Sequence, residues 1–423
     1  MSLSDAISAF ELRSVPVPRI HMSAKSPTRG LGKGRKKADN PTPKRVRADN
    51  RSMSYDWAVV GAGVFGSWIA HFLRQAGQSV LLLDAYGPAN SRASSGGESR
   101  LIRASYGADE IYTRWTKQSL PHWMALSRRS TLPLFHQVGV MRWAGRGDAH
   151  LAASVACLER CAIPFELLEG AELSRRFPQI AFDSDTAAVL EPEAGVLMAR
   201  RSIGTLVGEL IAQGVEYRQE AVQPSTSTQA GNVVFACGPW LPKLFPEVVG
   251  KRIRSTRQEI FFFGPPPAAF FGPPAVRFAI PGWIDSGDPR NPYGFPDLEN
   301  RGLKVAFHDL GPEFDPDTGD RQVSAEGVAA AREYLAMRFP ALRDAPLVES
   351  RVCQYENTSS ADFLIDRHPG KDNLWLVGGG SGHGFKHGPA LGEYLVNLAL
   401  HNAPADPRFS LASKEEEFAG TRL

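Results

Sequence analysis

Short apolar segments, glycine turns and helical stretches follow one another at both ends of the chain's globular part. Trp57–Val60 is an apolar run of the kind that forms a buried strand, and a helical pattern follows up to Ala76, where Gly77 is placed to end the helix. Ser79–Asp84 is a second apolar strand. A strand, a glycine turn, a helix and a strand within about 30 residues predict a βαβ unit and a parallel sheet.

The middle of the chain has a different pattern. Residues 135–143, 258–263 and 303–307 are predicted strands. Proline-rich loops, among them 265–267 and 273–274, separate these strands, which favours an antiparallel sheet. Leu374–Val377 is again a strand of the buried type, followed by glycines and by a helical stretch to about Leu400. One domain therefore opens and closes the globular part, and a second is inserted into it.

Composition narrows the class of protein. The chain has 423 residues, enough for two domains, and its 43% apolar and 22% charged residues exclude global disorder. The sequence has no apolar run of about 18 residues, so no membrane-spanning helix is expected. Four scattered cysteines are too few for a disulfide framework or a zinc ribbon, so no metal site is expected and a cytoplasmic location is the default.

Residues 1–52 form a basic leader, because they hold twelve Lys/Arg and four Asp/Glu in a chain with a net charge of +3. The remainder is mildly acidic, so the charge does not indicate nucleic-acid binding by the whole protein. The leader is rich in Pro, Ser and Gly and is expected to be disordered. Three interpretations stay open: a solvated tail ahead of a true start at Met53, a cleavable targeting peptide, or an arm that contacts nucleic acid.

The turn after the first strand carries the pattern G-x-G-x-x-G at Gly61, Gly63 and Gly66. The first glycine makes a tight turn, the second lets the backbone approach a pyrophosphate, and the third lets helix and strand pack closely. Asp84 ends the second strand, where a carboxylate can accept hydrogen bonds from ribose hydroxyls. The strand, turn, helix, strand and acid together predict a bound dinucleotide, against the alternative of a glycine-rich turn without a ligand.

Two further glycine turns favour FAD over NAD. Residues 232–240 form a strand that ends in a small-x-Gly turn at Ala236 and Gly238. Residues 378–386 form a third turn between a strand and a helix, with Gly380, Gly382 and Gly384 allowing the backbone to approach a flat ring system.

The predicted fold is therefore α/β, with an FAD-binding Rossmann-like βαβ domain and an inserted substrate domain built on an antiparallel sheet (α+β). The FAD-binding domain is expected to be discontinuous, over residues 53–135, 190–250 and 350–410. The substrate domain is expected over residues 136–189 and 251–349.

With these motifs the chain resembles the monomeric sarcosine oxidase group of FAD-dependent amine oxidases, which includes N-methyltryptophan, pipecolate and fructosyl-amine oxidases. The resemblance covers roughly residues 54–400. Besides the glycine turn with Asp84, it is carried by residues 99–107, 191–197, 293–296, 302–304, 308, 353–355 and 381–386.

The resemblance implies roles for residues that the pattern alone would leave as ordinary side chains. It implies that Cys353 is joined covalently to the 8α-methyl of the flavin, where cationic neighbours would favour the thiolate. Ser94 is among the implied cofactor-binding residues. Lys304 corresponds to the lysine that activates oxygen, because a fixed positive charge stabilises superoxide. Arg100 corresponds to an arginine near the isoalloxazine.

The same resemblance implies a substrate pocket. Arg103 and Lys386 correspond to the pair that binds the substrate carboxylate, the first by a bidentate fork and the second by a point charge. Tyr293, His308 and Tyr355 correspond to residues that shape the pocket and orient the amine. One position departs from the group: sarcosine-specific members have a histidine where this chain has Gly96. We therefore expect a roomier pocket and a secondary amine bulkier than sarcosine.

The expected activity is oxidation of a secondary (N-alkyl or cyclic) amino acid to an imine, with oxygen reduced to hydrogen peroxide. The expected partners are a small secondary amine with a carboxylate and molecular oxygen, for a monomer that binds neither membrane nor nucleic acid. Two alternatives stay open within enzymes, a flavin amine dehydrogenase with another acceptor and an enzyme like glycine or D-amino-acid oxidase. A distant third is a flavin-bearing scaffold with a basic binding tail.

Overall fold

The computed structural model describes residues 54–266 and 280–416. The basic leader and the prolines at 273–274 lie outside the described residues. The first sheet has six strands in the order β16–β17–β10–β1–β2–β9, which cover Leu364–His368, Lys371–Gly378, Ala230–Phe235, Tyr55–Val60, Val80–Asp84 and Glu216–Gln219. All pairs are parallel except the edge pair β16–β17. The predicted βαβ unit is confirmed.

The second sheet has eight strands in the order β15–β11–β14–β13–β12–β5–β7–β6, which cover Leu347–Asn357, Arg254–Phe263, Leu303–Phe307, Pro292–Phe295, Gly282–Asp285, Val140–Gly145, Thr186–Glu191 and Glu166–Glu169. Its pairs are antiparallel, as expected, except β5–β12. β15 belongs to this sheet as far as Asn357, past residue 350, where the sequence placed the return to the first domain. The domain division itself stays a prediction.

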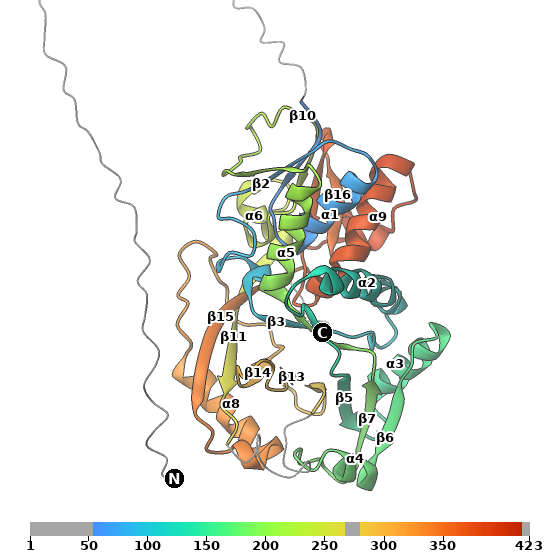
Figure 1. The fold of residues 1–423 in the computed structure, drawn as a ribbon, viewed down its shortest axis with the longest axis vertical. Helices are drawn as coiled ribbons and strands as arrows, with labels where there is room; N and C mark the ends of the chain where they lie inside the picture. The colour runs from blue at the N-terminus through green and yellow to red at the C-terminus, as the bar shows by residue number, and fades with distance from the viewer. Residues whose placement is uncertain (1–53, 267–279, 417–423) are drawn as a thin grey trace, which may run out of the picture. The chain divides into compact units, whose positions relative to one another are not determined.

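A small third sheet, β3–β8–β4, covers Ser99–Ile102, Gly195–Met198 and Phe135–His136. The single strand predicted over residues 135–143 is therefore wrong. Gly139 has a φ of +72°, and the chain turns there, so that β4 pairs with β8 while β5 joins the second sheet. Figure 1 shows β3 between the two larger sheets.

The longer helices are α1, α2, α3, α5, α8 and α9, over Val64–Gln75, Glu110–Arg129, Ala149–Arg160, Ala199–Ala212, Ala325–Arg338 and Gly388–His401; the short α4 and α6 cover Gly170–Arg176 and Leu241–Leu244. α1 and α9 lie side by side against the first sheet although they come from opposite ends of the chain (Figure 1). Gly392 permits this, because a Cβ there would come within 2.8 Å of the Trp68 carbonyl oxygen. No helix within the described residues is long and apolar enough to cross a membrane.

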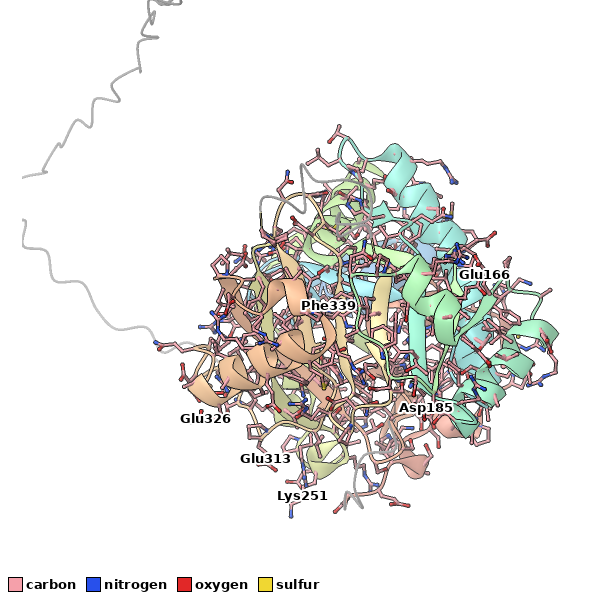
Figure 2. All side chains as sticks on the ribbon, turned by 90° about the horizontal axis from the view of Figure 1, so that it is seen from below. Glu166, Asp185, Lys251, Glu313, Glu326 and Phe339 are labelled. Carbon is pink, nitrogen blue, oxygen red and sulfur yellow. The ribbon has the colours of Figure 1, made fainter. Side chains whose placement is uncertain are left out.

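Each large sheet has its own apolar core. Trp68, Leu73 and Leu391 belong to the core between the first sheet and its helices. The core of the second sheet includes Trp283 and Phe339, whose ring centroids lie 4.9 Å apart. In Figure 2 Phe339 lies inside, beside α8, whereas the labelled Lys251, Glu313 and Glu326 lie at the margin.

We predict that Gly66→Ala lowers the free energy of unfolding by about 1–3 kcal/mol. A Cβ at Gly66 would overlap the backbone carbonyl oxygen of Gly61, which cannot move without opening the turn. The measurement is denaturant unfolding of the wild type and the variant. Gly208→Ala in α5 is the matched control, because nothing lies within 4 Å of its added Cβ and a helical Gly→Ala change stabilises by about 0.5–1 kcal/mol. A Gly66→Ala protein as stable as the wild type would contradict the packing argument.

Candidate active site

The turn between β1 and α1 is built for close backbone approach. Gly61 has a φ of +108°, and a Cβ there would overlap the carbonyl oxygen of Ala236, the residue that follows the neighbouring strand β10. Gly63 is the N-cap of α1 and lines a cavity into which the first turn of the helix opens. A helix N-terminus offers N–H groups and a partial positive charge to an anion. The three glycines therefore have the positions that the dinucleotide motif predicts.

Asp84 lies at the end of β2 beside this turn. Its Oδ2 accepts the Ala62 N–H at 2.8 Å and its Oδ1 accepts the Tyr86 N–H at 2.9 Å. Burial raises the pKa of this carboxyl, while these backbone donors act in the opposite direction. Gly87 is a third backbone donor to this group, and because a carboxylate has about four lone-pair sites, about one remains for a hydroxyl donor of a ligand.

A cavity of about 400 Å³ runs from this turn to the other two glycine turns. Its wall includes Ala236 and Gly238 from the second turn and Gly380, Gly382 and Gly384 from the third. Ser94 and Glu356 also line it, and the Ser94 hydroxyl donates to Glu356 Oε1 at 2.6 Å. A Cβ at Gly238 would come within 3.0 Å of the same carboxylate oxygen. The glycine cradle, the helix N-terminus and the ribose-type carboxylate fit FAD.

A second cavity of about 170 Å³ adjoins the first. Arg100, Tyr355, Gly382 and Phe385 line both cavities. The larger cavity, on which the three glycine turns converge, thus opens onto a smaller one, the arrangement that a flavin enzyme needs to bring a substrate against its cofactor.

Arg103 and Lys386 meet in the second cavity although 283 residues separate them in sequence. Both contact Tyr106: the Arg103 guanidinium carbon lies 4.5 Å from the ring centroid, and Lys386 Nζ donates to the hydroxyl at 2.7 Å. Arg103 also donates to the Ser105 carbonyl. Burial, and then the charge of Arg103, hold the pKa of Lys386 well below its usual range. The two cations are placed to bind one anion.

Cys353 lies on β15, on the wall of the second cavity. Its sulfur is 3.5 Å from an Arg100 guanidinium nitrogen, so the cationic neighbour expected for a reactive thiol is present. Arg100 is fixed by the carbonyl oxygens of Ser94, at 2.6 Å, and Ser99, at 2.7 Å.

Lys304 of β14 is almost fully buried, with 2% of its surface exposed, behind the wall of the two cavities. Its Nζ donates to the Ser99 carbonyl at 3.2 Å and lies 4.2 Å from the Phe295 ring centroid. Burial and the charge of Arg100 hold the pKa of Lys304 well below its usual range.

Tyr293, His308 and Tyr355 form a polar chain on the cavity wall. The two tyrosine oxygens are 3.3 Å apart, and His308 Nδ1 is 3.2 Å from Tyr355 Oη. Burial, with the charges of Arg103 and Lys386, lowers the pKa of His308 to about 3, so the imidazole is neutral. A neutral imidazole can exchange hydrogen bonds with an amine without repelling it.

Several residues at the site were not identified from the sequence: Tyr106, Arg142, His150, Glu191, Glu356 and His383. Glu191 is 3% exposed and accepts the backbone N–H groups of Ala104, at 2.7 Å, and Ser105, at 2.9 Å, so it orders the loop that carries Arg103. Glu191 lies inside residues 191–197, a segment that carries the family resemblance, and this position is the one sequence feature that points to it. Arg142 stands within the apolar run of β5, and nothing in the sequence set it apart.

The expectation that Gly96 enlarges the pocket is wrong. A Cβ at Gly96 would overlap the backbone carbonyl oxygen of Asn90, so the missing side chain would point at this loop rather than into the cavity. The glycine is explained by close backbone packing.

One cluster with metal-ligand chemistry lies apart from the cavities: Glu110, Cys157 and Cys161 have ligand atoms within 4.8 Å of one another. The Glu110 carboxylate is bound by Arg114 at 2.5 Å and by Arg160 at 2.9 Å. Its charge is therefore matched within the protein.

Comparison with known proteins agrees with this geometry. The model of the family described as FAD dependent oxidoreductase matches residues 56–398. The chain belongs to this family of FAD-dependent oxidoreductases. Its fold class and its resemblance to the sarcosine oxidase group, both expected from the sequence, are confirmed.

Among its relatives is monomeric sarcosine oxidase of Streptomyces avermitilis, which is 31% identical over 84% of this chain and 96% of that protein. N-methyl-L-tryptophan oxidase of Salmonella heidelberg is 28% identical over 84% of this chain and 96% of that protein. Among solved structures, L-proline dehydrogenase from P. horikoshii has a TM-score of 0.71 at 19% identity, covering 84% of this chain and 96% of that chain. At that identity the structural match supports the fold alone.

Proposed function

We propose that this oxidoreductase converts a secondary (N-alkyl or cyclic) amino acid to an imine and reduces oxygen to hydrogen peroxide. The observation that carries the proposal is the pairing of Arg103 with Lys386 around Tyr106, in a cavity that opens onto the larger one lined by the three glycine turns. The relatives named as sarcosine and N-methyl-L-tryptophan oxidases support the same class of substrate.

The residues assigned to FAD divide by the part of the cofactor that they contact. Gly61 and Gly63 would hold the pyrophosphate at the start of α1, Gly66 lets the helix pack closely on the turn, and Asp84 would bind ribose hydroxyls. The residues assigned to the rest of the cofactor are Ser94, Ala236, Gly238, Gly380, Gly382 and Gly384. When bound, FAD would supply a ring that accepts the two electrons of the substrate C–H bond.

Arg103 and Lys386 bind the substrate carboxylate and so fix the position of its α-carbon. The cluster of positive charge raises the free energy of an ammonium group in the same cavity and therefore favours the neutral amine, the form that can be oxidised. Neutral His308, together with Tyr293 and Tyr355, accepts a hydrogen bond from this amine or donates one to it. No further general base is needed.

Lys304 is assigned to the oxygen reaction. An ammonium group held beside Arg100 stabilises negative charge on oxygen as it is reduced. The lowered pKa of Lys304 also makes this ammonium a stronger acid, and so a better proton donor to the product.

Cys353 is assigned to a covalent link with the flavin. The Arg100 guanidinium lies 3.5 Å from its sulfur, and such a cationic neighbour is typical of reactive thiols, which supports this assignment.

The proposed function is tested by anaerobic titration of the purified flavoprotein. We expect sarcosine-type N-methyl amino acids and pipecolate to bleach the flavin absorbance, and the corresponding primary amino acids to do so at least about tenfold less efficiently. Peroxide formation in air separates an oxidase from a dehydrogenase. Flavin that no secondary amino acid reduces would refute the proposal.

Lys304→Met is expected to slow reoxidation by oxygen by about 100-fold or more, the range found when one preorganised stabilising group is removed. Reduction by substrate should change much less, because Lys304 lies behind the cavity wall. Stopped-flow measurement of the rates of the two half-reactions, reduction and reoxidation of the flavin, tests this prediction. Equal slowing of both half-reactions would count against the oxygen role.

Cys353→Ala is expected to give a protein whose yellow colour passes into the supernatant on acid precipitation, whereas colour stays with the wild-type precipitate. Cys237→Ala is the matched control, since this cysteine lines the other cavity and donates to the Val60 carbonyl at 3.4 Å. Wild-type protein that already loses its colour would show that Cys353 carries no covalent flavin.

A further inference from the structure

The second cavity holds more positive charge than one substrate carboxylate requires. Arg142, at the third position of β5, lines the cavity together with Arg103 and Lys386. Burial, and then the charge of Arg103, lower the pKa of Arg142 to about 9, so the two guanidinium groups lie close enough to repel one another. A neutral substrate side chain would leave that repulsion in place.

Arg142 has no carboxylate partner within residues 54–266 and 280–416. Its Nε donates to the Ser286 hydroxyl at 2.9 Å, a neutral acceptor. The acids whose charge reaches Arg142 are Asp148 and Glu191, and both are engaged elsewhere. Asp148 caps α3 through the Leu151 N–H at 2.7 Å, and Glu191 accepts two backbone N–H groups.

The acids on the cavity wall are likewise occupied. Asp109 and Asp362 line the cavity, but both lie against Arg408, at 3.4 Å and 3.5 Å. Asp362 also accepts the Tyr112 hydroxyl at 2.7 Å. Within the described residues, carboxylates therefore contact Arg408 but none contacts Arg142.

A partly buried guanidinium that no carboxylate contacts is costly, and a carboxylate is the ligand that its planar fork fits best. His150 lies beside it on the cavity wall, and burial together with Arg142 and Arg103 lowers the pKa of this imidazole to about 4. A neutral His150 can donate one N–H to the same carboxylate.

We infer that the substrate carries a second carboxylate and that Arg142 binds it, while Arg103 and Lys386 bind the first. This rests on the proposed function, which assigns the α-carboxylate to Arg103 and Lys386. The small cavity, about 170 Å³, restricts the second group to a short side chain, as in N-methylaspartate, or a short N-substituent, as in iminodiacetate. Arg142 is thus a specificity-determining residue.

Binding of inert carboxylates tests the inference without turnover. Dissociation constants are measured from the change in flavin absorbance for pairs of equal length, succinate with butyrate and glutarate with pentanoate. We expect the wild type to bind each dicarboxylate about tenfold or more tighter, the range for one hydrogen-bonded charge pair. Arg142→Met should bring the ratio near one and leave butyrate binding unchanged, and Arg142→Lys should retain part of the preference.

Arg146→Met is the matched control, because Arg146 follows β5, is exposed, and faces Glu169 at 3.8 Å. It should keep the full preference for dicarboxylates. A wild type that binds succinate no tighter than butyrate, an Arg142→Met protein that weakens both alike, or an Arg146→Met protein that loses the preference would each overturn the inference. The wild-type ratio decides even where Arg142→Met fails to fold.

Turnover separates this inference from the proposed function. We expect kcat/KM for N-methylaspartate or iminodiacetate to exceed that for N-methylalanine by about tenfold, and Arg142→Met to remove this advantage through KM. The two substrates also show whether the second carboxylate stands on the side chain or on the nitrogen substituent. Efficient oxidation of N-methylalanine with no advantage for either dicarboxylate would refute the inference alone. Failure of every secondary amine would refute the proposed function as well.

Discussion

The candidate site depends on buried and partly buried cations that no carboxylate among the described residues contacts. Five such side chains lie in or directly behind the two cavities: Arg100, Arg103, Arg142, Lys304 and Lys386. A sixth basic side chain on the wall of the first cavity, Lys243, pairs with Asp315 and Asp317. Each of the first five is held by uncharged acceptors, mainly backbone carbonyl oxygens such as those of Ser94, Ser99, Ser105 and His383. A carbonyl satisfies the N–H donors and fixes their direction, but it leaves the net charge for a ligand to balance. A surface arginine, in contrast, can pair with a carboxylate, as Arg129 does with Glu209 at 2.7 Å.

The fold can hold these charges together because three sheets meet at the site. β3 lies between the two large sheets and carries Arg100, with Arg103 immediately beyond its end. β5 and β14 bring Arg142 and Lys304 from the second sheet, and the glycine turn after β17 brings Lys386 from the first. One element could not carry all of these cations, because like charges at neighbouring positions of a strand repel one another even before the strand pairs with another. Because the cations come from separate strands and turns, the stability of the whole fold offsets the free-energy cost of bringing like charges together.

Local features of the site were predictable from the sequence, and long-range ones were not. The glycines at 61, 63 and 66 and the carboxylate at 84 follow from a short pattern whose physical reason is local, and the structure gives each the expected position. The contact of Arg103 and Lys386 with Tyr106 was expected only through the family resemblance, since spacing cannot bring together residues 283 positions apart. The sequence does not single out Arg142, because an arginine that alternates with apolar residues in a strand has the pattern of a side chain that faces solvent. The expectation of a roomier pocket at Gly96 is wrong because the sequence does not show in which direction the missing side chain would point.

Asp285 at the end of β12 and Ser286 next to it show that the lack of a contacting carboxylate at Arg142 is not shared by every enclosed arginine among the described residues. Asp285 is fully buried and binds Arg338 at 3.0 Å, and it also accepts the Tyr334 hydroxyl at 3.3 Å. Ser286, the next residue, faces the other way and gives Arg142 only a hydroxyl. Where a buried arginine has a structural role, the chain supplies a carboxylate, because an unmatched charge in the interior costs several kcal/mol. Beside the cavity, the residue after this strand supplies a neutral acceptor, which orients the guanidinium and leaves its charge to be matched by a bound ligand.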